Sequence, residues 1–247
     1  MPGIARIDLP QNLTKLAYES IKAYILRENL DEHTRLTEDD LSRQLGISKS
    51  PVREALNSLA TEGLVHIEAR RGAYLRQFSR KEALDLYNLR EALEVYAVGA
   101  TVLTPKFIAE LGRSVQRTEK LLKSKDKQGH IDEDMHFHGL IAEATGNAEL
   151  SRVLSNLQSQ IWLCRRKTYD LSSSSAPHAH RAILDAFEKE DRKAAQTAMR
   201  RHIVHVREQL LAFLDDLSTR NGAKETLGYH AGRAGEFATR STRVRST

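Results

Sequence analysis

Asp134 and His138 form the first pair of residues whose types and spacing suit metal chemistry. They lie four residues apart in a segment that predicts a helix, so their side chains share one face. His136 lies about 200° round the helix from Asp134 and points away. Imidazole with one carboxylate suits Zn, Ni, Mn or Fe. Later predicted helices carry two further pairs of histidines, His178 and His180, and His202 and His205. Histidines from two other helices would complete a metal site inside a bundle, although the spacing alone also fits histidines scattered over the surface.

A second group of residues suits nucleic-acid recognition. Lys49, Ser50 and Arg53 occupy the first turns of a predicted helix for which Ser48 is the N-cap candidate. Pro51 is tolerated there because a first-turn N–H has no helical partner. A helix that enters the major groove of DNA reads bases with its N-terminal residues, and Lys, Arg and Ser can bond guanine or phosphate. The alternative is a small three-helix domain with incidental surface charge.

Residues 12–77 contain the elements that would position this helix. Apolar residues at helical spacing predict three helices, and two short strands follow them. Arg70, Arg71 and Gly72 turn the chain between these strands and would form the tip of a wing. The predicted elements are helices near 13–30, 37–45 and 48–62 and strands at 64–68 and 73–77.

Residues 78–217 predict six or seven helices and no strand, which is typical of an antiparallel all-α bundle. One long helix is expected over 147–171, and the four serines at 172–175 before Pro177 predict a loop. Residues 218–247 have few large apolar residues, no period and 6 Lys/Arg against 2 Asp/Glu. They predict a flexible basic tail. The fold class is therefore mainly α, with a winged helix-turn-helix ahead of the bundle.

Composition and charge indicate which partners the protein binds and in which cellular compartment it acts. The net charge is +5, and residues 41–77 hold 6 Lys/Arg against 3 Asp/Glu, so an anionic polymer would be attracted to this segment. Cys164 is the single cysteine, which excludes an intrachain disulfide. The N-terminal residues have no secretory pattern, and no apolar run approaches the 18 or so residues of a membrane span. We therefore expect a cytoplasmic protein without a membrane partner.

The stretch "DLSRQLGISKSPVREALNSLATEGLVHIEARRGAYL" closely resembles the winged-helix domain of the GntR family of bacterial transcription regulators. The resemblance implies that Lys49, Ser50 and Arg53 contact DNA and that Arg71 and Gly72 form the wing tip. Lys49 stands where arginine is common in the family. Many relatives carry a basic residue where this chain has the acidic run 38–40, and we expect that run to face away from phosphate.

Residues 82–215 resemble the FCD ligand-binding domain of the FadR-like subfamily, through "LREALE", "DMHFHGLIAEATGN", "HRAILDAFEKED" and "AMRRHI". The resemblance implies a divalent metal in the domain core, and three imidazoles with one carboxylate leave coordination positions open for an organic acid. Arg90 is the expected partner of that acid. The alternative for Arg90 is an intramolecular pair with Glu91 or Glu94, and Trp162 and Arg165 are further candidate lining residues. The implied metal ligands are Asp134, His138, His180 and His202.

These features predict a transcription regulator, as a repressor, that binds a palindromic operator as a homodimer. A small carboxylate at the metal site would change the relative arrangement of the two winged domains in the dimer, with a hinge around residues 77–81. One alternative is a metal-dependent enzyme, which would need a general base, and Glu133 and Glu143 lie on other faces of their helix. A pure metal sensor is a third hypothesis.

Overall fold

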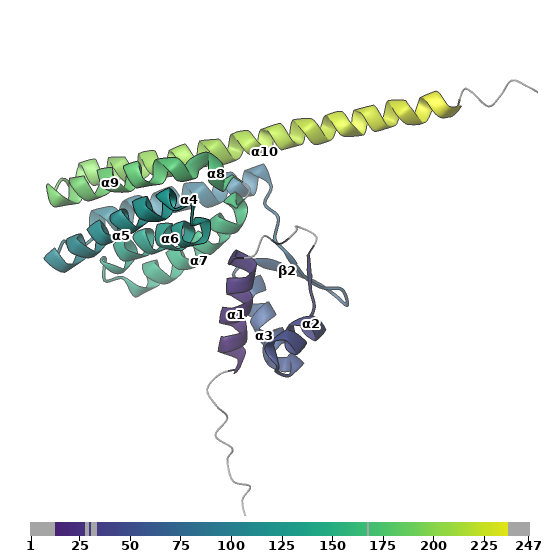
Figure 1. Cartoon of the computed structure of the whole chain (residues 1–247), viewed down its shortest axis with the longest axis horizontal. Helices are drawn as coiled ribbons and strands as arrows, with labels where there is room; N and C mark the ends of the chain where they lie inside the picture. Colours follow the sequence, from purple (N-terminus) through teal and green to yellow (C-terminus); the bar gives the residue numbers. More distant parts are fainter. Residues whose placement is uncertain (1–12, 28–29, 31–33, 167, 237–247) are drawn as a thin grey trace, which may run out of the picture.

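The computed structural model describes residues 13–27, 30, 34–166 and 168–236, with side chains described as far as Thr219. The predicted first residue of the N-terminal domain, 12, and the end of the predicted tail, 237–247, lie outside the described residues. The chain forms a small N-terminal unit and a larger helical unit, with a long final helix that extends beyond the helical unit (Figure 1). This architecture confirms the predicted winged helix-turn-helix followed by an all-α bundle.

The N-terminal unit packs three helices against a small antiparallel sheet. Its core combines Ile21, Leu56 and Leu75 with other buried apolar residues. The predicted two-stranded wing has a third strand, because Arg35 and Leu36 pair with the last strand. A two-residue strand carries no readable period, which explains why the sequence did not predict it. The elements are α1 (Leu13–Arg27), β1 (Arg35–Leu36), α2 (Glu38–Leu45), α3 (Lys49–Thr61), β2 (Val65–Glu68) and β3 (Gly72–Leu75), with sheet order β1-β3-β2.

Local capping fixes the helix-turn-helix. The Thr37 hydroxyl accepts a hydrogen bond from Asp40 N–H and caps α2. Gly46 ends α2 at φ +66°, a left-handed conformation that glycine adopts without strain. Ser48 takes the N-cap position of α3, as the sequence predicts, although its side chain makes no capping bond. The turn between the helices is therefore short and sets α3 directly after α2.

The helical unit contains seven α-helices and one 3₁₀ turn among the described residues. Two predictions about this unit were wrong. The predicted helix over 147–171 ends at Arg165. The predicted loop at 172–175 is helical: the Ser175 hydroxyl donates to the Ser172 carbonyl, and Pro177 falls in a first helical turn, where proline is tolerated. The elements are α4 (Arg80–Ala100), α5 (Pro105–Lys123), α6 (Lys127–Glu143), α7 (Ala148–Arg165), α8 (Tyr169–Ser172), η1 (Ser173–Ser175), α9 (Ala176–Glu188) and α10 (Arg192–Glu236).

The final helix also differs from its prediction. The structure continues α10 as helix through 218–236, where the sequence predicts a tail without regular structure. Adding a residue to an existing helix costs much less than starting a new one, so a helix can run into a segment with a weak pattern of its own. Figure 1 shows this part of α10 projecting past the other helices. None of the helices that the structure describes is both long and apolar enough to cross a membrane.

The linker before α4 and one face of α7 join the two units. Ser79 caps α4 in a capping box with Glu82, whose carboxylate also accepts a bond from Arg76. On α7, the Trp162 indole N–H donates to the Leu26 carbonyl at 2.8 Å, and the Gln160 amide donates to the Glu62 carbonyl at 2.8 Å. α7 is therefore in direct contact with the N-terminal unit.

Candidate metal centre and DNA-recognition helix

Three helices bring the four predicted metal ligands together in the interior of the bundle. α6 supplies Asp134 and His138, α9 supplies His180, and α10 supplies His202. Each residue offers one ligand atom, and these atoms all lie within 4.8 Å of one another. Of the other histidines considered, His178 and His205 are exposed. The structure thus gathers the four residues that the family resemblance implied.

Ring packing holds the imidazoles in place. The His180 ring stacks on Phe137, with centroids 3.8 Å apart and planes 5° apart. The His138 and His202 rings face each other at 5.3 Å and 20°. Because Phe137 is fully buried on α6, it fixes the orientation of a histidine that arrives from another helix.

Unsatisfied polar atoms show that these residues fit a cation. Both ring nitrogens of His180 and of His202 are buried and make no hydrogen bond to the described residues. The His180 Nε2 atom lies 3.4 Å from Asp134 Oδ1, which also lacks a hydrogen bond to them. Buried polar groups are normally paired, so a cluster of exceptions needs an explanation. Three imidazoles and a carboxylate are a donor set for a divalent transition metal.

The electrostatic setting gives these groups the protonation states that ligands need. Burial opposes ionisation of Asp134, but Arg165 and the three histidines outweigh it and lower the pKa of this carboxyl. Burial lowers the pKa of His180 to about 3 and that of His202 well below its usual value. An ionised carboxylate and neutral imidazoles can bind a metal without first losing protons.

Arg90 and Glu94 surround His138. Arg90 Nε donates to Glu94 Oε1 at 2.7 Å, and the other Glu94 oxygen contacts His138 Nδ1. Arg90 Nη2 lies 3.0 Å from His138 Nε2. Burial opposes ionisation of Glu94, but Arg90 and His138 outweigh it and lower its pKa to about 2. A carboxylate that bonds a metal-ligand histidine fixes the orientation of the imidazole. From the sequence, Glu94 is expected only as a partner of Arg90.

The intramolecular ion pair considered as the alternative role for Arg90 is therefore present. Arg90 pairs with Glu94, four residues later in α4. The pair does not satisfy the whole guanidinium, because Arg90 Nη1 is buried without a hydrogen bond to the described residues. Arg90 also borders a small cavity beside the metal ligands. The cavity is lined by Arg90, Ile131, Asp134, Met135, His138, Gln158, Ile161, Trp162, Arg165 and Tyr169.

The two further candidate residues, Trp162 and Arg165, both line this cavity. Arg165 is buried, and its Nη1 atom lies 3.6 Å from Asp134 Oδ2. The cavity measures about 20 Å³, and a single water needs about 10–15 Å³ on the same scale. Two guanidinium groups therefore border a space large enough for about one water molecule.

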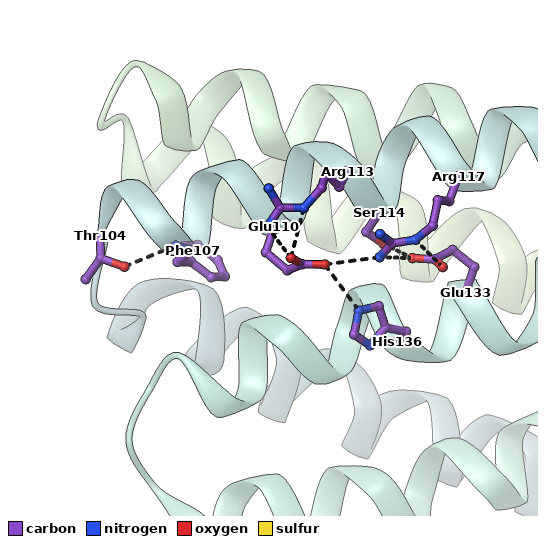
Figure 2. A network of polar contacts seen from close by, with 8 residues as sticks. All are labelled: Thr104, Phe107, Glu110, Arg113, Ser114, Arg117, Glu133 and His136. Carbon is purple, nitrogen blue, oxygen red and sulfur yellow. Dashed lines mark hydrogen bonds and ion pairs between the residues drawn. The ribbon is translucent and has the colours of Figure 1, made fainter.

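Glu133 and His136 also lie on α6, but their contacts are with residues of α5 (Figure 2). Glu133 accepts hydrogen bonds from Ser114 at 2.5 Å and from Arg117 Nε at 2.8 Å, both on α5. His136 is largely exposed, and its Nε2 atom lies 3.9 Å from a Glu110 oxygen. Both side chains contact α5, with Glu133 partly buried and His136 exposed, and Glu143 is exposed. The glutamates considered as a general base therefore lie away from the candidate metal ligands.

The predicted DNA-contacting residues lie on exposed surfaces of the N-terminal unit. Lys49, Ser50 and Arg53 are exposed on the first turns of α3. Arg71 and Gly72 lie at the β2–β3 turn, where the Arg71 guanidinium pairs with Glu68 at 3.1 Å. The structure thus leaves all five predicted residues at the surface or wing tip, in contrast to the buried metal ligands.

The acidic run 38–40, which is expected to face away from phosphate, lies beside the predicted DNA-contacting residues. Glu38 accepts two hydrogen bonds from Arg53, and Asp39 contacts the Lys49 ammonium. The short turn brings the first turn of α2 beside the first turns of α3. The acids therefore lie next to the cations that are expected to meet DNA.

The comparisons with known proteins agree with this geometry. Residues 13–75 match the gntR family of bacterial regulatory proteins, and residues 85–205 match the FCD domain. The Nta operon transcriptional regulator of Aminobacter aminovorans is 30% identical over 206 residues, which cover 76% of this chain and 91% of that protein. The transcriptional repressor RspR of Escherichia coli K12 is 24% identical over 204 residues, covering 81% of this chain and 90% of its own length.

A solved structure shares the fold. A GntR regulator from Rhodococcus sp. RHA1 superposes with a TM-score of 0.72 at 20% identity, covering 81% of this chain and 97% of that one. The fold and the matched domains define a DNA-binding transcription regulator rather than an enzyme. This chain belongs to the GntR family and carries an FCD domain.

Proposed function

We propose that this regulator is a repressor that binds a palindromic operator as a homodimer and responds to a small carboxylate at a metal centre in its FCD domain. It would act in the cytoplasm, on operator DNA. The observation that carries the proposal is the buried Asp134 and histidine cluster beside the unpaired Nη1 of Arg90. Repression is supported by a relative named as a repressor.

The chemistry of the centre favours an organic acid as effector. Asp134, His138, His180 and His202 would hold a divalent ion such as Zn, Ni or Mn, and such an ion supplies open positions that attract carboxylate oxygens. Arg90 Nη1 is a buried donor on the same cavity. Arginine recognises carboxylates well, and an unpaired buried guanidinium donor is costly. Arg90 would therefore orient the acid that binds at the ion.

On the DNA side, Lys49, Ser50 and Arg53 would enter the major groove, and Arg71 and Gly72 would approach the backbone or minor groove. The exposure of these residues at the start of α3 and at the wing supports this assignment. Two copies related by a two-fold axis would present two recognition helices to two half-sites. A palindromic operator is the expected target.

Coupling between the two sites would pass through α7. An acid larger than a water molecule does not fit the cavity of about 20 Å³ unless its wall moves. Ile131, Met135 and Trp162 form the wall that this cavity shares with a groove of about 280 Å³ between α1 and α6. Trp162 also bonds Leu26 in the N-terminal unit. An effector that displaces Trp162 would loosen that bond, with the linker at 77–81 as the hinge.

A pure metal sensor is a second candidate function, favoured by the small size of the cavity. In that case the ion itself would be the effector. A chelator would then change operator affinity without any organic ligand, whereas the leading proposal requires a carboxylate in addition to the ion.

Selection of duplexes from a random pool by the full-length protein tests the proposal. We expect a short palindrome, and we expect Arg53→Ala to weaken its enrichment. The recovered duplex then serves as the probe for screening Zn²⁺, Ni²⁺ and Mn²⁺ with a set of small mono- and dicarboxylates for release. Failure to enrich any sequence in the presence of metal would contradict the proposed operator binding, and release by chelator alone would favour the metal sensor.

A further inference from the structure

Arg53 is held by a two-point contact with Glu38. Arg53 Nε donates to Glu38 Oε1 at 2.7 Å, and Arg53 Nη2 donates to Glu38 Oε2 at 2.6 Å. The two residues are fifteen positions apart, on the first turns of α2 and α3. Parallel bonds of this kind fix both the position and the plane of a guanidinium. Arg53 is thus oriented before any DNA is bound.

This contact uses one edge of the guanidinium and leaves the other end available. A guanidinium has five N–H donors, of which Glu38 takes one from Nε and one from Nη2. Nη1 makes no hydrogen bond to the described residues, so a pair of donors from Nη1 and Nη2 remains at the outer end. A pair of parallel donors is what the O6 and N7 atoms of guanine accept in the major groove.

The charge of Glu38 also affects contacts that carry no sequence information. Arg53 lowers the pKa of Glu38 through their hydrogen bonds, so the carboxylate is ionised at neutral pH. An ionised partner offsets the positive charge of Arg53 and weakens its attraction to phosphates of any sequence. Glu38 therefore opposes non-specific binding while it aligns the arginine for a base.

We propose that Glu38 is a specificity-determining residue that positions Arg53 to read a guanine and restrains it from binding phosphate. The proposal rests on the proposed contact between Arg53 and DNA. It assigns a role to the acidic first turn of α2.

Two neighbouring pairs provide comparisons within the same helix. Asp39 contacts Lys49, but an ammonium is a point charge without a plane to align. Asp40 pairs with Arg43 inside α2 at 2.7 Å and bonds no residue of α3. Asp40→Asn is therefore a matched control, because it removes one exposed carboxylate from the same turn and leaves the Glu38–Arg53 pair intact.

The test is a set of parallel selections from a random duplex pool with full-length protein and with Glu38→Gln, Arg53→Ala and Asp40→Asn. We expect Arg53→Ala to lose a guanine preference at one position in each half-site. Glu38→Gln should lose the preference at the same position, because the amide cannot accept both guanidinium bonds. Asp40→Asn should keep it. Retention of that guanine preference by Glu38→Gln would overturn the proposal.

Binding measurements on the selected duplex and on a scrambled duplex give the size of the loss in specificity. For Glu38→Gln, we expect the ratio of the two dissociation constants to fall about tenfold or more, which is the range of one bidentate base contact. The salt dependence on scrambled DNA should steepen by about one phosphate contact, since Arg53 becomes free to bind the backbone. A ratio that stays within about twofold of wild type would contradict the proposal.

The Glu38→Asp variant tests the positioning of Arg53 separately from the effect of the negative charge at residue 38. It keeps the carboxylate but shortens the side chain by one methylene group, so the two-point contact is lost. We expect reduced specificity without tighter binding to scrambled DNA, and full specificity in this variant would overturn the positioning role. Circular dichroism and thermal unfolding identify variants that fail to fold. If Arg53→Ala itself keeps the full preference, the proposed DNA contact fails, which is distinct from failure at Glu38 alone.

Discussion

The Trp162 indole N–H donates a hydrogen bond of 2.8 Å to the Leu26 carbonyl, and this bond links the wall of the metal-site cavity to the end of α1. Trp162 is buried and borders both the cavity and the groove between α1 and α6. One side chain therefore contacts the proposed effector site and the DNA-recognition unit. A change in the position of Trp162 would therefore alter both the cavity and the contact with α1.

Trp162 is the only tryptophan in the chain, so tryptophan emission reports on the surroundings of this one side chain. We expect any carboxylate that releases the operator to red-shift the emission, because displacement of the indole exposes it to water. The measurement is an emission spectrum of metal-loaded protein during titration with the acid. An acid that releases DNA and leaves the emission unchanged would contradict a route through Trp162.

Trp162→Phe keeps an aromatic ring and removes the N–H donor. We expect the free energy of unfolding to fall by about 1–3 kcal/mol, because the Leu26 carbonyl loses its partner. Urea denaturation measures this cost. Operator release should also need less effector, since no interdomain bond has to break, and an unchanged effector requirement would show that this bond is not part of the coupling.

Removal of one histidine from the cluster should abolish tight metal binding. His180→Ala and His202→Ala are expected to weaken Zn²⁺ affinity by at least about 100-fold, more than the loss of an outer partner of a ligand. Wild type with Zn²⁺ at 100 times its dissociation constant should gain about 2.7 kcal/mol of stability, and these variants should gain little. Metal content after dialysis and thermal unfolding are the two readouts.

His136→Ala is the matched control for the metal prediction. His136 belongs to the same helix as Asp134 and His138, but it faces Glu110 on the surface. The control should keep wild-type metal content. Stoichiometric metal in His180→Ala, or loss of metal in His136→Ala, would show that the ion binds somewhere other than the buried cluster.

The sequence predicted most of the helices, and the family resemblance named the four residues that the structure brings together as a candidate metal centre. The i,i+4 spacing of Asp134 and His138 placed two ligands on one face, and helical periodicity is a local property that can be read from one segment. The choice of His180 over His178 came from the family resemblance, because no local pattern shows which histidine faces a distant helix.

Features that depend on contacts between segments were not predicted. The pairing of Glu38 with Arg53 joins two helices, and helical period does not indicate which exposed faces will meet. The strand at Arg35 is two residues long and exists only because it pairs with Tyr74. The role of Glu94 is an intermediate case, since its pairing with Arg90 follows from i,i+4 spacing while its contact with His138 does not.

Gly72 has a structural requirement that is separate from any contact with DNA. Its φ of +108° lies in the region that residues with a side chain rarely adopt, and an added Cβ would lie 3.0 Å from the Leu36 carbonyl oxygen. We expect Gly72→Ala to lower the free energy of unfolding by about 1–3 kcal/mol. Gly139→Ala is the control, because no atom lies within 4 Å of its added Cβ. Gly139→Ala, within a helix, should stabilise the protein by up to about 1 kcal/mol. Equal effects of Gly72→Ala and Gly139→Ala in urea denaturation would refute the structural requirement for glycine at position 72.

The capping box at the start of α4 should make stability depend on acid pH. Hydrogen bonds from the Ser79 side chain and backbone, and then from Arg76, lower the pKa of Glu82 from 4.5 to about 2. A carboxyl group with a lowered pKa in the folded state adds stability that is complete above its unfolded pKa. That stability is lost as the pH falls from about 4.5 toward 2.

Ser79→Ala removes the cap and the largest cause of this shift. We expect a loss of about 1 kcal/mol in unfolding free energy at pH 7, and the difference between wild type and variant should shrink as the pH is lowered toward 3. Urea denaturation of both proteins across that range measures the difference and cancels the titration of other carboxylates, which the two proteins share. A difference that stays constant from pH 7 to pH 3 would mean that Ser79 stabilises α4 only through the Glu82 backbone N–H.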